Sequence, residues 1–192
     1  IRYLIVTGVQ TCALPISGNN ADILNVNGGL VKLSNLTLKD SKTAAIIANS
    51  AVFQAINASF ANMNNGAVKN AGNASFSGKN DFVNNTAAIG NGGALNLEKE
   101  SETKFSDSSL FENNTAATGN GGAIYGDGSV YLGDQNKLIS AVFTNNTATD
   151  GGAVFVDENG KFGGYGEFIF GQDSDANGNV ATNSGGAIYN KG

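Results

Sequence analysis

Two short stretches that follow each other closely decide the fold of this chain: FVNNTA at residues 82–87 and GNGGALNL at residues 90–97. Both return further along the chain. The first returns as FENNTA at 111–116 and FTNNTA at 143–148, and the second as GNGGAIYG at 119–126, TDGGAVFV at 149–156 and NSGGAIYN at 183–190. The alanine after the glycine pair stands at 94, 123, 153 and 187, so successive copies lie 29, 30 and 34 residues apart. Such a period is the signature of a repeat architecture.

Each period divides into short β-branched or alternating segments separated by turn residues, which is typical of strands. In two successive periods these segments are 123–125, 129–132 and 139–143, then 153–156, 161–162 and 167–170. Strands this close cannot form βαβ units, because each crossover of such a unit needs a dozen or more residues. We therefore predict an all-β fold: a right-handed parallel β-helix with three short strands per coil, about six to seven coils and an open C-terminal end.

The repeated residues are interpreted as structural. The phenylalanines are expected to stack inside the solenoid, each ring burying a large area against its copies. The asparagines suit a hydrogen-bonded amide ladder and a left-handed corner, and the glycine pair suits a sharp turn. The structural repeat residues are Phe82, Asn85, Gly92, Gly93, Phe111, Asn114, Gly121, Gly122, Phe143, Asn146, Gly151, Gly152, Gly185 and Gly186.

Composition excludes several classes of function. The 192 residues include 27 Gly and 28 Asn, no His and a single Cys. Catalytic triads that use histidine, Cys/His zinc sites and internal disulfides are therefore excluded. The net charge of −5 has the wrong sign for electrostatic binding to nucleic acid. No run of about 18 apolar residues could cross a membrane as a helix.

Residues 1–17 differ in composition from the rest and hold the only Arg, Cys and Pro of the chain. The string VTGVQTCALPI at 6–16 resembles a translated sequencing adapter, and we interpret residues 1–17 as non-native. A signal peptide is the alternative, but Gly8, Gln10 and Thr11 interrupt its apolar run. Residues 18–192 are then expected to be a fragment of the β-helical region.

The paired FxxN and GGA(I/L/V) motifs resemble the polymorphic outer-membrane protein repeat of chlamydial surface proteins and other bacterial autotransporter passengers. The resemblance implies a β-helical passenger at the cell surface, on the outer membrane or secreted, that acts as an adhesin for a protein or glycan ligand of a host cell or surface. It implies attachment to the outer membrane only through a C-terminal barrel, which this sequence lacks together with a signal peptide. Phe170 also departs from the pattern, because Gly171-Gln172-Asp173 follows it. A structural stalk is a further alternative.

The rival interpretation is a β-helical lyase or glycosidase, which works with clustered carboxylates, calcium and a basic residue. After Ser17 the chain has no Arg. Its acids are scattered. Glu98, Glu100 and Glu102 lie close together, but the intervening Lys99 and the following Lys104 are typical of a solvated turn. Glu112, Asp157, Glu158 and Glu167 are isolated or lie in turns. We predict that the chain is not an enzyme and name no catalytic residue. Sequence spacing leaves open whether carboxylates meet across coils.

One segment has the pattern of a metal site. Asp173, Asp175 and Asn177, followed by Gly178, match the first half of a calcium-binding loop, in which alternating oxygen ligands converge. The twelfth position is Ser184 instead of the bidentate Glu. Calcium at these three residues is therefore the only cofactor that the sequence suggests, and a plain polar loop is the alternative.

Overall fold

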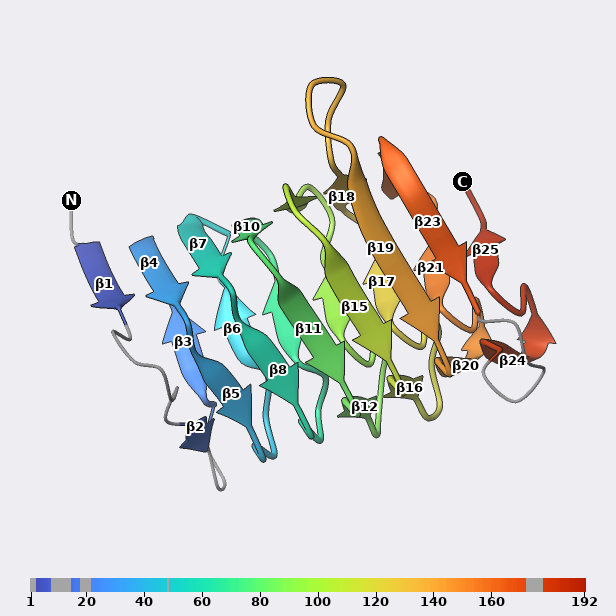
Figure 1. Ribbon diagram of the computed structural model, residues 1–192. Helices are drawn as coiled ribbons and strands as arrows, with labels where there is room; N and C mark the ends of the chain where they lie inside the picture. Colours follow the sequence, from blue (N-terminus) through green and yellow to red (C-terminus); the bar gives the residue numbers. More distant parts are fainter. Residues whose placement is uncertain (1–2, 8–14, 18–21, 48, 172–177) are drawn as a thin grey trace.

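The computed structural model describes residues 3–7, 15–17, 22–47, 49–171 and 178–192, and within these ranges it contains strands and turns but no helix. The strands form four parallel sheets, three of which run the length of the molecule, and the two chain ends lie at opposite ends of the stack (Figure 1). Each strand pairs with the equivalent strands of the coils before and after it. The all-β parallel β-helix predicted from the repeats is confirmed.

Three sheets hold seven strands each, in agreement with the predicted six to seven coils. The first sheet contains β1 (Tyr3–Thr7), β4 (Gly29–Ser34), β7 (Ala51–Ile56), β10 (Asn73–Ser77), β14 (Glu102–Phe105), β18 (Ser129–Leu132) and β22 (Lys161–Gly164). The second contains β2 (Pro15–Ser17), β5 (Thr37–Lys39), β8 (Ser59–Ala61), β11 (Asn80–Val83), β15 (Ser109–Glu112), β19 (Ile139–Thr144) and β23 (Gly166–Phe170). The third contains β3 (Leu24–Val26), β6 (Ala45–Ile47), β9 (Val68–Asn70), β13 (Leu95–Leu97), β17 (Ile124–Gly126), β21 (Val154–Val156) and β25 (Ile188–Asn190).

A fourth, smaller sheet was not predicted. It lies between the second and third sheets in each of the last four coils, and it is formed by β12 (Thr86–Ala87), β16 (Thr115–Ala116), β20 (Thr147–Asp150) and β24 (Val180–Ser184). Its shortest strands have only two residues, which is too few for an alternating pattern to be visible in the sequence. These coils therefore have four strands instead of three.

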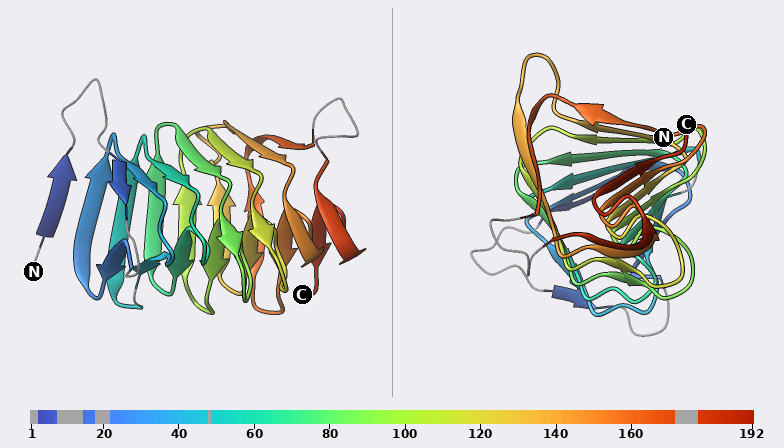
Figure 2. Two further views of the ribbon diagram at one scale, coloured as in Figure 1. Left: turned by 90° about the horizontal axis from the view of Figure 1, so that it is seen from below. Right: turned by 90° about the vertical axis from the view of Figure 1, so that its right-hand side faces the viewer.

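The winding of the chain is right-handed. From the N-terminal to the C-terminal end, the chain runs down the second sheet at the front and up the third sheet at the back (Figure 1). Viewed along the axis, the sheets enclose a roughly triangular cross-section (Figure 2). This hand agrees with the strong preference of parallel β–crossover–β connections for right-handedness.

Alternation along the strands sorts side chains between the interior and the surface. In β18, Val130 and Leu132 are buried while Ser129 and Tyr131 face outward, and β15 buries Ser109 and Phe111 in the same way. Because the register pairs equivalent positions, each inward residue lies beside its counterpart in the next coil, as Phe111 lies beside Phe143. The core is therefore a set of columns parallel to the axis.

Two strands fall within the segment interpreted as non-native. β1 pairs with β4 from Tyr3↔Leu30 to Thr7↔Ser34, and β2 pairs with β5 from Pro15↔Thr37 to Ser17↔Lys39. Exposed parallel edges accept extended segments readily, because their unpaired N–H and C=O groups template another strand. The pairing therefore does not depend on where the segment comes from, and its origin stays a prediction.

Candidate functional site

The phenylalanine of each repeat lies at the centre of the solenoid. The rings of Phe60, Phe82, Phe111, Phe143 and Phe170 stack nearly parallel, with centroids 4.9, 5.0, 4.7 and 4.8 Å apart in that order. Phe82, Phe111 and Phe143 are fully buried, while Phe170 at the end of the stack is only partly buried. The stack is the main apolar column of the core.

A second aromatic column from the first sheet packs against it. Phe76 and Phe105 stack with centroids 4.7 Å apart, and each meets Phe82 edge to face at 5.4 and 6.1 Å. Offset and edge-to-face contacts are the favourable arrangements of aromatic pairs and add stability beyond the area that they bury. Repetition of the FxxN motif does not reveal this second column.

The second asparagine of each repeat forms a buried amide ladder. The side-chain N–H of Asn85 donates to the side-chain oxygen of Asn114 at 2.9 Å, Asn114 donates to Asn146 at 3.0 Å, and Asn146 donates to Asn179 at 2.8 Å. Each amide also donates to a backbone carbonyl of the preceding coil, as Asn114 does to Phe82 at 2.9 Å. Because every amide is satisfied along the axis, polar groups can be buried here at little cost.

The first asparagine of each repeat has a different task. Asn84, Asn113 and Asn145 have φ of 57°, 54° and 55°, the left-handed conformation that asparagine tolerates better than most residues. The two tasks that the sequence analysis assigned to asparagine are thus divided between neighbouring residues: one makes the corner and the next makes the ladder.

Asn179 continues the ladder although it lies outside the FxxN pattern. It follows Phe170 by nine residues instead of three, yet its side chain bonds to Asn146 and to the carbonyl oxygen of Phe143. β24 then restores the register, with Val180 beside Thr147 and Ala181 beside Ala148. The departure after Phe170 is therefore an insertion ahead of the ladder position. The N-(T/V)-A triplet was the available signal.

The two glycines of each turn also differ in role. The first glycine has positive φ, for example 67° at Gly121 and 61° at Gly151. The second is needed because neighbouring backbones approach it. A Cβ on Gly122 would lie 2.1 Å from the carbonyl oxygen of Gly152 and 2.5 Å from the amide nitrogen of Thr147. No side chain can be accommodated at that distance.

This contact predicts unequal effects of the same substitution. Gly122→Ala is expected to lower the free energy of unfolding by about 1–3 kcal/mol, because backbone must move to admit the methyl group. Gly186→Ala is the matched control, since its nearest atom would be 3.7 Å away, and it should cost less than about 0.5 kcal/mol. Urea unfolding monitored by circular dichroism measures both, and equal costs would contradict the contact.

An aromatic column also runs along the third sheet. Tyr125, Phe155 and Tyr189 stack with centroids 5.5 and 5.1 Å apart. The Tyr125 hydroxyl donates to the Asp157 carboxylate, and the Lys191 ammonium lies 3.2 Å from Asp157. Burial, followed by the hydrogen bond to Asp157, raises the pKa of Tyr125, while that hydrogen bond lowers the pKa of Asp157.

The lowered pKa of Asp157 predicts a difference at acid pH. The Asp157 carboxyl binds its proton less readily in the folded state than in the unfolded state. Its stabilising contribution is therefore complete above the unfolded pKa of about 3.9 and is lost as the pH falls through the lower folded pKa. Asp157→Asn should remove this contribution. The urea midpoint of the variant is expected to fall less than that of the natural chain between about pH 6 and pH 2; parallel curves would contradict the linkage.

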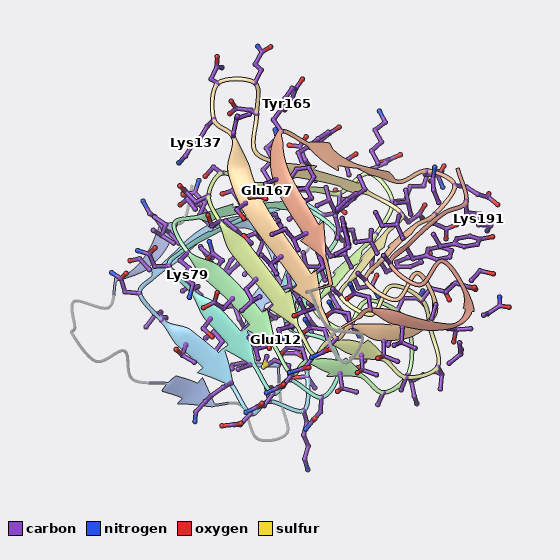
Figure 3. The ribbon with its side chains drawn as sticks, turned by 45° about the vertical axis from the view of Figure 1, so that its right-hand side comes forward. Lys79, Glu112, Lys137, Tyr165, Glu167 and Lys191 are labelled. Atoms are coloured by element: carbon purple, nitrogen blue, oxygen red, sulfur yellow. The ribbon has the colours of Figure 1, made fainter. Side chains whose placement is uncertain are left out.

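A groove of about 860 Å³ opens on the outer face of the first sheet. Its floor and walls come from three successive coils and from the long loop 133–138, which stands above the other turns between β18 and β19 (Figure 1). The lining residues are Glu102, Lys104, Phe105, Ser106, Tyr131, Gly133, Asp134, Gly163, Gly164 and Tyr165. Tyr165 is 52% exposed and lies beside the loop that carries Lys137 (Figure 3).

The acids weighed for a catalytic site have ordinary surface surroundings. Glu98 and Glu100 are exposed, and Glu102 forms an ion pair with Lys104 at 2.7 Å. The carboxyls with a resolved pKa shift, Asp40, Asp107 and Asp157, are all shifted downward by hydrogen bonds, whereas a general acid needs an upward shift. The groove brings Glu102 and Asp134 to one surface, but Asp134 accepts hydrogen bonds from the backbone of its own loop.

The suggested calcium ligands Asp173, Asp175 and Asn177 lie outside the described residues, so calcium binding there stays a prediction. Within the described ranges, no three Asp, Glu, Cys or His side chains gather closely enough to hold a metal ion. The part of the chain that the structure describes also has no helix that is long and apolar enough to span a membrane.

Stacked coils, an aromatic column and an amide ladder define the class: this is a β-helical repeat protein. The sequence profile of the Chlamydia polymorphic membrane protein repeat matches residues 108–127, 140–157 and 177–191, so the chain carries three copies of that repeat. The repeat is that of a surface-protein family rather than an enzyme family. The third match includes Asn179 and the glycine pair after it. Comparison with curated proteins and with solved structures gave no significant match.

Proposed function

We propose that this chain forms part of the passenger of an autotransporter-type surface protein and acts there as an adhesin. The observation that carries the proposal is the repeat itself: three matches to the polymorphic membrane protein repeat coincide with stacked coils of a continuous parallel β-helix. The internal roles of the Phe, Asn and Gly residues explain how the solenoid is built. Binding is therefore assigned to its outer faces and loops.

The architecture suits attachment. A solenoid exposes a long surface for its mass, because each coil contacts only its neighbours and loops can vary without changing the core. The loop 133–138 is such a variation, since the equivalent turn one coil earlier has only residues 106–108 between β14 and β15. The net charge of −5 disfavours nucleic acid, which leaves proteins and glycans of a host cell or surface as the partners.

Attachment can be tested with coated beads. Latex beads carrying the folded chain should attach to cultured epithelial cells, and an excess of soluble folded chain should compete with them. Beads coated with the chain after unfolding in urea are the control, since they have the same composition and charge. Attachment equal to that of the control would overturn the adhesin role and favour the structural stalk.

A further inference from the structure

The groove on the first sheet is lined by both aromatic and charged side chains. It combines the exposed ring of Tyr165 and the half-buried ring of Tyr131 with the Glu102–Lys104 ion pair and the carboxylate of Asp134. Ligand pockets typically have volumes of about 300–1,000 Å³ and combine aromatic surface with a few polar groups. At about 860 Å³ the groove falls in that range.

The space beside Tyr131 is created by a glycine. Tyr131 faces outward from β18, and its register partner in β22 is Gly163. A Cβ on Gly163 would meet no atom within 4 Å, so the position is open to solvent. In the preceding coil the same column holds Lys104. Replacing a side chain by hydrogen at this one position leaves one side of the Tyr131 ring accessible.

The backbone of the groove offers little to an extended peptide. A peptide that adds to a sheet needs free backbone N–H and C=O groups. Here the N–H of Gly133 donates to Phe105 at 2.7 Å, and the N–H of Tyr165 donates to Leu132 at 2.8 Å. Gly164 packs so closely that a Cβ would lie 1.9 Å from the carbonyl oxygen of Leu132. Between β18 and β22 the groove therefore presents side chains and satisfied backbone. β22 is the last described strand of its sheet, so a peptide would have to add along the outer edge of β22 rather than in the groove.

We infer that this groove is a saccharide-binding site for a neutral or N-acetylated oligosaccharide. A sugar ring presents an apolar C–H face to a tyrosine ring and hydroxyl groups to the surrounding carboxylates, ammonium and phenols, which supply both donors and acceptors. The carboxylates of Glu102 and Asp134 outnumber the ammonium of Lys104, and this net negative charge disfavours phosphate and acidic sugars. This inference rests on the proposed function, because it names the kind of ligand that an adhesin of this form would take.

The test uses the full chain and defined probes. The N-acetylglucosamine tetramer, cellotetraose and maltotetraose are titrated calorimetrically, with tetragalacturonic acid as the acidic counterpart. At least one neutral probe should bind, and the acidic one should not. Gly163→Val fills the open space and Tyr131→Ala removes the ring, and each should weaken binding at least about tenfold, which corresponds to about 1.4 kcal/mol.

Ser75→Val is the matched control. Ser75 faces outward from β10 in the same column as Lys104 and does not line the groove, so its variant should bind as the natural chain does. Failure of all neutral probes to bind would overturn the assignment, as would equal binding by Gly163→Val or the capture of peptides from a random library in place of sugars. If the natural chain binds none of the sugars and its beads still attach to cells, the adhesin role stands and the groove assignment falls. If the chain binds a sugar and its beads do not attach, the groove assignment stands and the adhesin role falls.

Discussion

Replacing Phe143 by alanine is expected to lower the free energy of unfolding by about 3–5 kcal/mol. The ring is fully buried and stacked on both faces, 4.7 Å from Phe111 and 4.8 Å from Phe170. Truncation removes both contacts and leaves a cavity that stacked coils cannot close, because the register holds them in place. Chemical denaturation monitored by far-ultraviolet circular dichroism measures the loss.

Two further variants provide reference values for the loss of stability at Phe143. Phe143→Leu keeps most of the apolar volume and should cost less than the alanine variant. Ile89→Ala, at a site that is 85% exposed, should change the stability by less than about 0.5 kcal/mol. A cost at Phe143 as small as that at Ile89 would mean that the ring stack does not stabilise the solenoid.

Asn114→Ala is the second substitution with a large expected effect, a loss of about 3 kcal/mol or more. The fully buried side chain of Asn114 accepts from the backbone and side-chain N–H groups of Asn85 and donates to the carbonyl oxygen of Phe82 and the side-chain oxygen of Asn146. Alanine leaves these four partner groups without that bond inside the core, and each buried unsatisfied group costs about 1–3 kcal/mol. Equilibrium unfolding in urea measures the total.

The neighbouring residue is the natural control. Asn113 is exposed with φ of 54°, a conformation that glycine adopts without strain. Asn113→Gly should therefore leave the stability within about 0.5 kcal/mol of the natural chain. If Asn113→Gly and Asn114→Ala lower the free energy of unfolding equally, the assignment of the corner to Asn113 and of the ladder to Asn114 is wrong.

The core could be predicted because its residues recur. Phe82, Phe111 and Phe143 share one motif, and a parallel stack places equivalent residues side by side. Asn179 was missed as a ladder residue because its spacing from Phe170 is broken by an insertion, and loop length is only weakly constrained by the coils that it joins. Spacing within a motif therefore predicts the interior better than spacing between motifs does.

The surface could not be predicted in the same way. Tyr131 and Tyr165 line one groove although they are 34 residues apart and belong to no repeated motif. The bond from Tyr125 to Asp157 joins residues 32 apart. Such contacts depend on the length of each turn and on the register between neighbouring coils. A local sequence pattern predicts neither of these.

The amide ladder makes the solenoid axis chemically polar. Asn85, Asn114 and Asn146 each donate a side-chain N–H toward the C-terminal neighbour and present oxygen to the N-terminal one. A further coil can join this ladder in only one orientation, because a copy turned end for end would set donor against donor. Coils can therefore be added along the axis in only one direction. The amides that hydrogen-bond inside the solenoid also disfavour end-to-end pairing of two molecules in inverted orientation.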